Sequence, residues 1–451
     1  MNRETIAFLL TLFVMEILML TVHFRLAGNV LLLSMFVSIV YAFSRKMDRM
    51  FMISWMVSVA PVVVFIRSTM ISESVYAIMT VLIGVLSLLT MRKQVERVIY
   101  NKNILFIIAF FLLYIAIGLV EGIKPIKFMK VVEFGTTLML ISMLLYSPEH
   151  RGFALRNFVF SSIAVYIVAF PNIANRYATP TELGWTIGGD PSSMAALLLI
   201  SLILLLFDGG KILKLNNQPK TLLALTMVVF ILLLLSTSRT NMISMLIILL
   251  FYAFKNRVNF LKYLAIVLVL FTVSLTYLSD QYFDTIEKFY VKKLDVRNRT
   301  LNQVTTARFV QWQVGMHYFD VAPLSEVLFG YGPARADFLH EKGKDYVRVY
   351  GYIDGAEHHY AIHTLYLQLA VEYGLIAFSI FIFVLLKSLY KNFLLYLKGR
   401  EVLFYYTIGY MFSIMGNSGM SVIGGVYMAF IFAGSRIFNE HYLRQNEKLK
   451  I

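Results

Sequence analysis

Long apolar runs constrain this chain more than any other feature of its sequence. Ile6–Phe24 and Ile104–Val120 approach or reach the ~17–25 residues that cross a bilayer as a helix. Shorter apolar cores follow at Met194–Phe207, Leu222–Ser236 and Tyr263–Leu278. The chain is 59% hydrophobic and only 15% charged, which leaves too little polar surface for a soluble protein of 451 residues. We therefore expect an all-α, polytopic integral membrane protein.

The apolar runs predict about 12–14 transmembrane helices, because runs of this kind can merge or re-enter. Ile6–Phe24 has no small-residue cleavage site soon after it, so we expect it to be the first helix and not a cleaved signal. The candidate spans begin near Ile6, Ala27, Met50, Ser74, Asn103, Lys127, Phe153, Ser192, Thr221, Asn241, Phe260, Ala361, Glu401 and Ser418.

The connecting loops alternate in their content of Lys and Arg, and this alternation predicts the topology. Basic residues gather at 45–49, 92–102, 211–220, 255–262 and 387–400 and in the tail after 436, whereas the other loops hold few. Short basic loops stay in the cytoplasm, so we expect both termini to be cytoplasmic and the sparse loops to face outward. The net charge of +15 is then a topology signal that favours anionic membrane lipids as partners and gives no reason to expect nucleic acid.

One outward segment is far longer than the rest. Asp280–Tyr360 is about eighty residues long, a length that usually means function, and its charges almost balance. We expect transmembrane helices in residues 1–279, a large extracytoplasmic loop in 280–360, and the last transmembrane helices with a cytoplasmic tail in 361–451. Within the loop, "TIEKFYVKKL" and "TTARFVQWQVGMHYF" predict short amphipathic helices, and the glycine-punctuated "LFGYGPARADF" predicts a turn after them.

Three of the eight histidines lie where this loop meets the next apolar run, in "AEHHYAIHTLYLQ". His359 and His363 are four residues apart and can share a helix face, which is compatible with a metal site. No HExxH motif or second pair of ligands accompanies them, and the chain has no cysteine. We therefore expect no metal, and an interfacial structural role for His358.

Arg239, in "LLSTSRTNMIS", lies in a tight outward connection where no long loop requires a charge. A snorkelling arginine at the membrane interface is one explanation. The other is a fixed cation for a phosphate group, because guanidinium stays protonated and donates two hydrogen bonds in one plane.

Four motifs in order resemble a known family. They are the "SR" pair at Arg239, an Arg-x-x-x-Trp start in "ARFVQW", the "LFGYGPARADF" turn, and a helix that reads "HTLYLQLAVEYGLIAFSIFIF". This order resembles the bacterial superfamily of O-antigen ligases and polysaccharide repeat-unit polymerases, which includes Wzy-type polymerases and WaaL-like ligases. The resemblance covers roughly Pro171 to Phe383. The chain departs from the family pattern at Thr364, where Asn is frequent, and in Asp190-Pro191-Ser192, where Asn-Pro-Asn is frequent.

The resemblance implies a GT-C-like glycosyltransferase of the bacterial inner membrane that takes a glycan from undecaprenyl diphosphate on the outer face. It maps the implicated site residues to Arg239, Arg308 and His363. Fixed cations stabilise a departing diphosphate, and a neutral histidine can take the proton of a sugar hydroxyl, so we expect inversion at the anomeric carbon without metal or cofactor. Arg176, Tyr331 and His359 are candidate substrate-binding residues.

Three functions remain open at this point. The first is polymerisation of lipid-linked repeat units of O-antigen, capsule or exopolysaccharide, for which the family also implies a chain-length regulator as a partner. The second is ligation of the finished glycan to lipid A-core. The third, from another class, is a secondary transporter or lipid-linked sugar flippase that would use Glu16 or Glu133 for coupling.

Overall fold

The computed structural model describes residues 50, 53–54, 56–58, 61, 70–100, 102, 104–105, 107, 109, 125–178, 191–207, 218–235, 238–255, 308–330, 345, 364–399, 401–415 and 427–432. All regular structure within these ranges is helical, which confirms the all-α expectation for this part of the chain. The helices are α4 (Met70–Thr90), α5 (Arg92–Ile99), α7 (Pro125–Leu145), α8 (Pro148–Ala178), α9 (Pro191–Phe207), α11 (Pro219–Leu235), α12 (Arg239–Lys255), α16 (Arg308–Val321), α17 (Leu324–Phe329), α19 (Leu365–Leu397) and α20 (Val402–Ser413).

The helix starts follow from local chemistry. α7, α8, α9 and α11 each begin with a proline. The N–H groups of a first helical turn have no partner within the helix, so proline loses nothing there, and its fixed φ suits the helix. Proline at these four positions therefore favours the start of a helix there.

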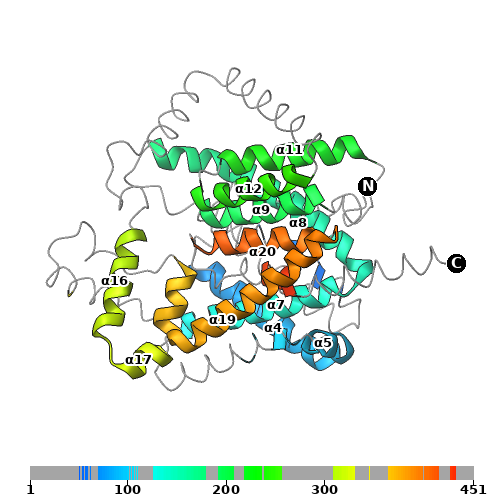
Figure 1. Ribbon diagram of the computed structural model, residues 1–451. Coiled ribbons are helices and arrows are strands. Elements are labelled where there is room, and N and C mark those ends of the chain that lie inside the picture. The colour runs from blue at the N-terminus through cyan, green and yellow to red at the C-terminus, as the bar shows by residue number, and fades with distance from the viewer. Residues whose placement is uncertain are drawn as a thin grey trace.

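Most of the longer helices coincide with apolar runs that predict membrane spans. These helices are α4, α7, α8, α9, α11, α12, α19 and α20. Among the described residues, α19 is the helix long and apolar enough to cross a membrane, and shorter apolar stretches lie in α4, α7, α9, α11 and α12. In Figure 1, α9, α11, α12 and α20 run side by side, and α16 and α17 lie at one end of them.

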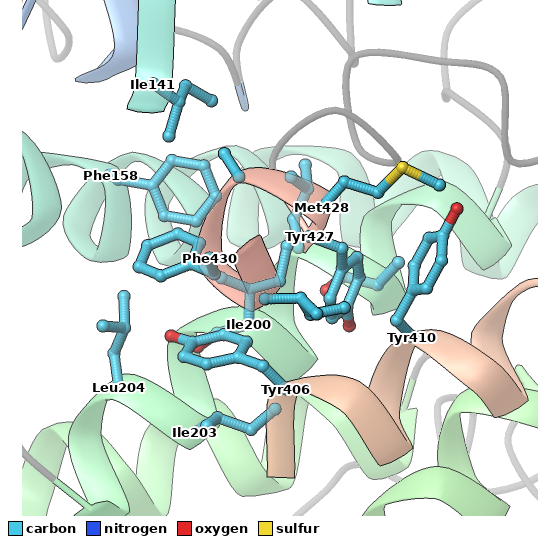
Figure 2. Close-up of a cluster of buried hydrophobic side chains, with 14 of the residues drawn as sticks. Ile141, Phe158, Ile200, Ile203, Leu204, Tyr406, Tyr410, Tyr427, Met428 and Phe430 are labelled. Atoms are coloured by element: carbon cyan, nitrogen blue, oxygen red, sulfur yellow. The ribbon is translucent and has the colours of Figure 1, made fainter. Parts of the chain in front are cut away.

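Buried tyrosines join the central helices (Figure 2). Tyr406 of α20 stacks on Phe430 with 4.6 Å between ring centroids, and its hydroxyl donates to the carbonyl oxygen of Ile200 in α9 at 3.3 Å. Tyr427 donates in the same way to the carbonyl oxygen of Ala196 at 3.2 Å. Each ring contributes apolar area while its hydroxyl finds an acceptor on a neighbouring backbone, so polar groups are buried without loss of hydrogen bonding.

Two segments that the charge pattern placed in loops are helical. Residues 92–99 form α5, whose Val95 and Val98 are buried while Arg92 is exposed and pairs with Glu96 at 2.8 Å. The distribution of Lys and Arg did not predict this amphipathic helix, because a helix of this kind is indicated by the spacing of its apolar residues and not by its charges. Arg176 lies in the last turns of α8, not in a loop, because the helix continues to Ala178. Glu133 is buried in α7, and Glu16 lies outside the described residues.

α19 is bent at Gly374, which has φ of 80° and ψ of 167° inside the helix. The part before the bend lies along α16, and the part after it crosses the molecule (Figure 1). At 1.5 Å per residue, the part after Gly374 is about 34 Å long, enough for the ~30 Å apolar core of a bilayer. The predicted span that begins near Ala361 is therefore two segments, of which the second has the length to cross.

A backbone crossing holds this bend. Gly330, directly after α17, also has a positive φ of 88°. A Cβ on Gly374 would overlap the carbonyl oxygen of Leu328 and the nitrogen of Gly330, and one on Gly330 would overlap the carbonyl oxygen of Glu372. Only glycine combines this backbone conformation with so close an approach, so the two glycines fasten the end of α17 to the bend.

Replacement of Gly374 by alanine tests this crossing. We expect Gly374→Ala to lower the free energy of unfolding by well over the ~1–2 kcal/mol that a left-handed conformation costs a residue with a Cβ. The matched control is Gly399→Ala, because Gly399 has φ of 83° but no atom within 4 Å of its added Cβ. Thermal unfolding of the detergent-purified variants measures both, and equal shifts in midpoint would show that the crossing contributes nothing.

Candidate active site

The structure describes part of the predicted site. The structure describes the backbone of Arg239 in α12, of Arg308 in α16 and of Arg176 in α8, but not the side chains of these three residues. His363, His359, His358 and Tyr331 lie outside the described residues altogether. The position of the site is therefore built from the helices that carry these residues.

Arg239 is the first residue of α12, and Ser238 precedes it as the cap. The carbonyl oxygen of Ser238 accepts from the N–H of Met242 at 2.9 Å, and its hydroxyl accepts from the side-chain Nδ2 of Asn241 at 2.9 Å. Serine is common at this position, and here its hydroxyl holds the side chain of Asn241 in the first turn. The "SR" pair is thus a helix start whose first residue is the arginine.

α12 and α20 lie against each other in opposite directions. Phe251 contacts Phe404 near one end, with 5.1 Å between ring centroids, and Ile248 approaches Gly409 further along. At 1.5 Å per residue, Arg239 lies about 18 Å from Phe251 toward the start of α12, and Ile414 lies about 15 Å from Phe404 toward the end of α20. The start of α12 and the end of α20 are therefore at the same end of the bundle.

The end of α20 also meets the start of α19. The carbonyl oxygen of Ile414 accepts from the N–H of Leu365 at 3.0 Å, and the hydroxyl of Tyr366 donates to the carbonyl oxygen of Met411 at 3.0 Å. His363 is two residues before Leu365 in the chain. The backbone that leads out of His363 is thus held at the bundle end where α12 begins.

α16 brings the third candidate to the same end. The indole N–H of Trp312 donates to the hydroxyl of Thr364 at 2.9 Å, and Gly315 packs against Leu367. Both contacts advance along the two helices in the same direction. Arg308 is four residues before Trp312, so it lies on the same face about 6 Å further toward the start of α16.

Together these contacts gather three helix starts at one end of the bundle. The starts of α12 and α16 are Arg239 and Arg308, and the start of α19 directly follows His363 and Thr364. The N–H groups of first helical turns and the positive end of the helix dipole both favour an anion. Two arginines at such starts make this end of the molecule suited to a negatively charged group such as a diphosphate.

One buried pair was not predicted. Within α16, His317 is buried and its Nε2 lies 3.5 Å from Oδ2 of Asp345 in the long loop. No sequence motif pointed to a role for His317, although the apolar residues Val314 and Tyr318 near it indicate a buried face. Within the described ranges, no three His, Asp or Glu side chains are close enough to hold a metal.

A comparison with known protein families agrees with the predicted resemblance. Residues 222–382 match a family model described as O-antigen ligase. The match covers roughly a third of the chain and includes Arg239, Arg308 and His363, but not Arg176. Members of the family are membrane glycosyltransferase-like ligases and polymerases that act on lipid-linked glycans at the inner membrane. Among curated proteins, none matches the chain.

Cross-linking tests whether α19 and α20 meet as described. The chain has no cysteine, so Leu365→Cys/Ile414→Cys would hold its only two thiols. A backbone hydrogen bond of 3.0 Å brings the two Cα atoms within the ~4.4–6.8 Å that a disulfide requires, so mild oxidation should remove both maleimide-reactive thiols. The control Leu365→Cys/Val402→Cys places its second thiol about 18 Å away along α20, and should stay reactive. Equal oxidation of the two pairs would contradict the arrangement.

Proposed function

We propose that this chain, whose residues 222–382 match a family model described as O-antigen ligase, polymerises lipid-linked oligosaccharide repeat units. The donor is the growing glycan on undecaprenyl diphosphate, and the acceptor is a hydroxyl of the next lipid-linked repeat. The product is an O-antigen, capsular or exopolysaccharide chain. The observation that carries this proposal is the gathering of the helix starts at Arg239, Arg308 and Thr364 at one end of the bundle.

The proposed reaction needs the chemistry that these residue types provide. The acceptor oxygen attacks the anomeric carbon while the bond from this carbon to the diphosphate oxygen breaks. His363 takes the proton of the acceptor hydroxyl, and Arg239 and Arg308 stabilise the charge that collects on the leaving undecaprenyl diphosphate. Attack opposite the leaving group inverts the anomeric carbon. No metal or cofactor takes part in this scheme.

The proposed surroundings of the site follow from the apolar runs and the basic loops. The protein is a multi-pass protein of the bacterial inner membrane, with both termini in the cytoplasm and the site on the outer face. Residues 280–360 form the extracytoplasmic loop between the two transmembrane regions. Arg176, Tyr331 and His359 bind the glycan or its carrier, and a chain-length regulator is a further partner.

A ligase is the second candidate function, because the matching family model is itself described as O-antigen ligase. The donor and the three proposed catalytic residues would be the same. Only the acceptor would differ, since a ligase uses a sugar of lipid A-core in place of the next lipid-linked repeat.

Substitution of the proposed catalytic residues tests the mechanism. In an assay with purified protein and lipid-linked repeat, we expect His363→Ala, Arg239→Ala and Arg308→Ala each to reduce polymer formation about a hundredfold or more. His150→Ala and Arg92→Ala are matched controls outside the site and should retain activity, because Arg92 is exposed and paired with Glu96. Normal polymer length with His363→Ala or Arg239→Ala would refute the proposal. A chelator should leave wild-type activity unchanged, and its loss would refute a metal-free mechanism.

Deletion of the gene distinguishes the two candidate functions. Without a polymerase, cells should carry glycans of a single repeat unit, because no repeat is added to the first. Without a ligase, chains of normal length should accumulate on the carrier lipid. Electrophoresis of the cell-surface and carrier-bound glycans measures both outcomes, and accumulation of full-length carrier-bound chains would contradict the polymerase.

A further inference from the structure

We propose that Trp312 and Thr364 are a positioning pair that sets the distance between Arg308 and His363. The inference rests on the proposed function, in which these two residues act on the same glycosyl transfer. Neither Trp312 nor Thr364 needs to touch the substrate. Their role is to join the helix that begins at Arg308 to the helix start that follows His363.

Thr364 is used in an unusual way. It stands at the N-cap of α19 in an extended conformation, with φ of −120° and ψ of 116°, and its side chain makes no capping hydrogen bond. A threonine here normally accepts from an N–H of the first helical turn. Its hydroxyl, in a side chain that is 3% exposed, instead accepts from the indole of Trp312 at 2.9 Å. The Thr364 hydroxyl therefore bonds to α16 and does not cap α19.

A second contact keeps the two helices in register. A Cβ on Gly315 would lie 2.6 Å from Cδ1 of Leu367, so glycine is the residue that lets α16 lie directly on α19. Gly315 follows Trp312 by three residues in α16, and Leu367 follows Thr364 by three residues in the chain. One hydrogen bond would leave α16 free to rotate about it, whereas two contacts along the same direction fix both its height and its angle.

The pair acts at short range on both proposed catalytic residues. Arg308 is one helical turn before Trp312 on the same face, and His363 is peptide-bonded to Thr364. A displacement of α16 along α19 therefore moves the backbone of Arg308 by the same amount relative to Thr364, the residue that follows His363. Reacting groups held about 1 Å out of place can lose about a hundredfold in rate.

The chain also contains a matched hydrogen bond away from the site. In the part of α19 after the bend, Nδ2 of Asn392 donates to the hydroxyl of Thr407 in α20 at 2.9 Å, and both side chains are buried. It joins two helices through a threonine hydroxyl at the same distance as the Trp312 bond. Thr407→Val removes this bond, and also the donation of the Thr407 hydroxyl to the carbonyl oxygen of Leu403 at 2.8 Å, so it is at least as disruptive to packing as Thr364→Val while leaving Arg308 and His363 untouched.

The test compares Thr364→Val with Thr407→Val in the purified polymerase assay. We expect the turnover number of Thr364→Val to fall about tenfold or more while its KM for the lipid-linked donor and its unfolding midpoint stay close to those of Thr407→Val. Thr407→Val should keep wild-type turnover. Thr364→Ser, which retains the acceptor oxygen, should restore turnover.

Trp312→Phe provides an independent measurement, because it removes the N–H and keeps an aromatic ring. It should show the same loss of turnover as Thr364→Val. The variant with both substitutions should be no slower than either alone, since each removes the same bond. Losses that multiply in the double variant would overturn the pairing.

The remaining outcomes separate this inference from the proposed function. Thr364→Val with the turnover of Thr407→Val, beside an inactive His363→Ala, would overturn the positioning pair alone. Thr364→Val with a much lower unfolding midpoint and no rescue by Thr364→Ser would show a structural brace, which also overturns it. Full activity of His363→Ala would refute the proposed function itself.

Discussion

The crossing of two glycine backbones at the bend of α19 fastens the end of α17 to this helix. Because Gly374 accepts the end of α17, the part of α19 before the bend can lie along α16 while the part after it packs on α20. The Arg308 helix and the Arg239 helix meet at the start of α19, through the bond of Trp312 to Thr364 and the bond of Leu365 to Ile414. The crossing at Gly374 holds the other end of this segment of α19.

The site end and the opposite end of the bundle are built differently. Tyr396, Phe251 and Phe404 form an aromatic cluster far from the proposed site, in which the hydroxyl of Tyr396 donates to the carbonyl oxygen of Phe251 at 3.3 Å. At the site end lie three short hydrogen bonds: one from the Asn241 side chain to Ser238, one to the carbonyl of Ile414 and one from the tryptophan N–H to Thr364. Aromatic packing thus lies away from the proposed site, and backbone and side-chain hydrogen bonds lie where a charged substrate is proposed to bind.

The sequence predicts the helices well and their contacts poorly. Apolar runs and prolines such as Pro191 and Pro219 locate helices because the spacing of apolar residues and the fixed φ of proline act locally. The bend escaped prediction because Gly374 lies inside a predicted span, and its close approach to Leu328 involves a residue that is far away in sequence. The order of motifs indicated Arg239, Arg308 and His363, but the bond from Trp312 to Thr364 spans 52 residues and has no local signature.

The position of α20 in the chain has a consequence for how the protein is made. Every proposed catalytic residue is synthesised before α20, yet the start of α19 is held in place by the carbonyl of Ile414 at the end of that helix. The ribosome therefore makes the three proposed catalytic residues before it makes α20, the helix that holds the start of α19. A nascent or truncated chain that stops before α20 contains the three proposed catalytic residues but lacks this support, so the proposed activity requires that α20 has been made.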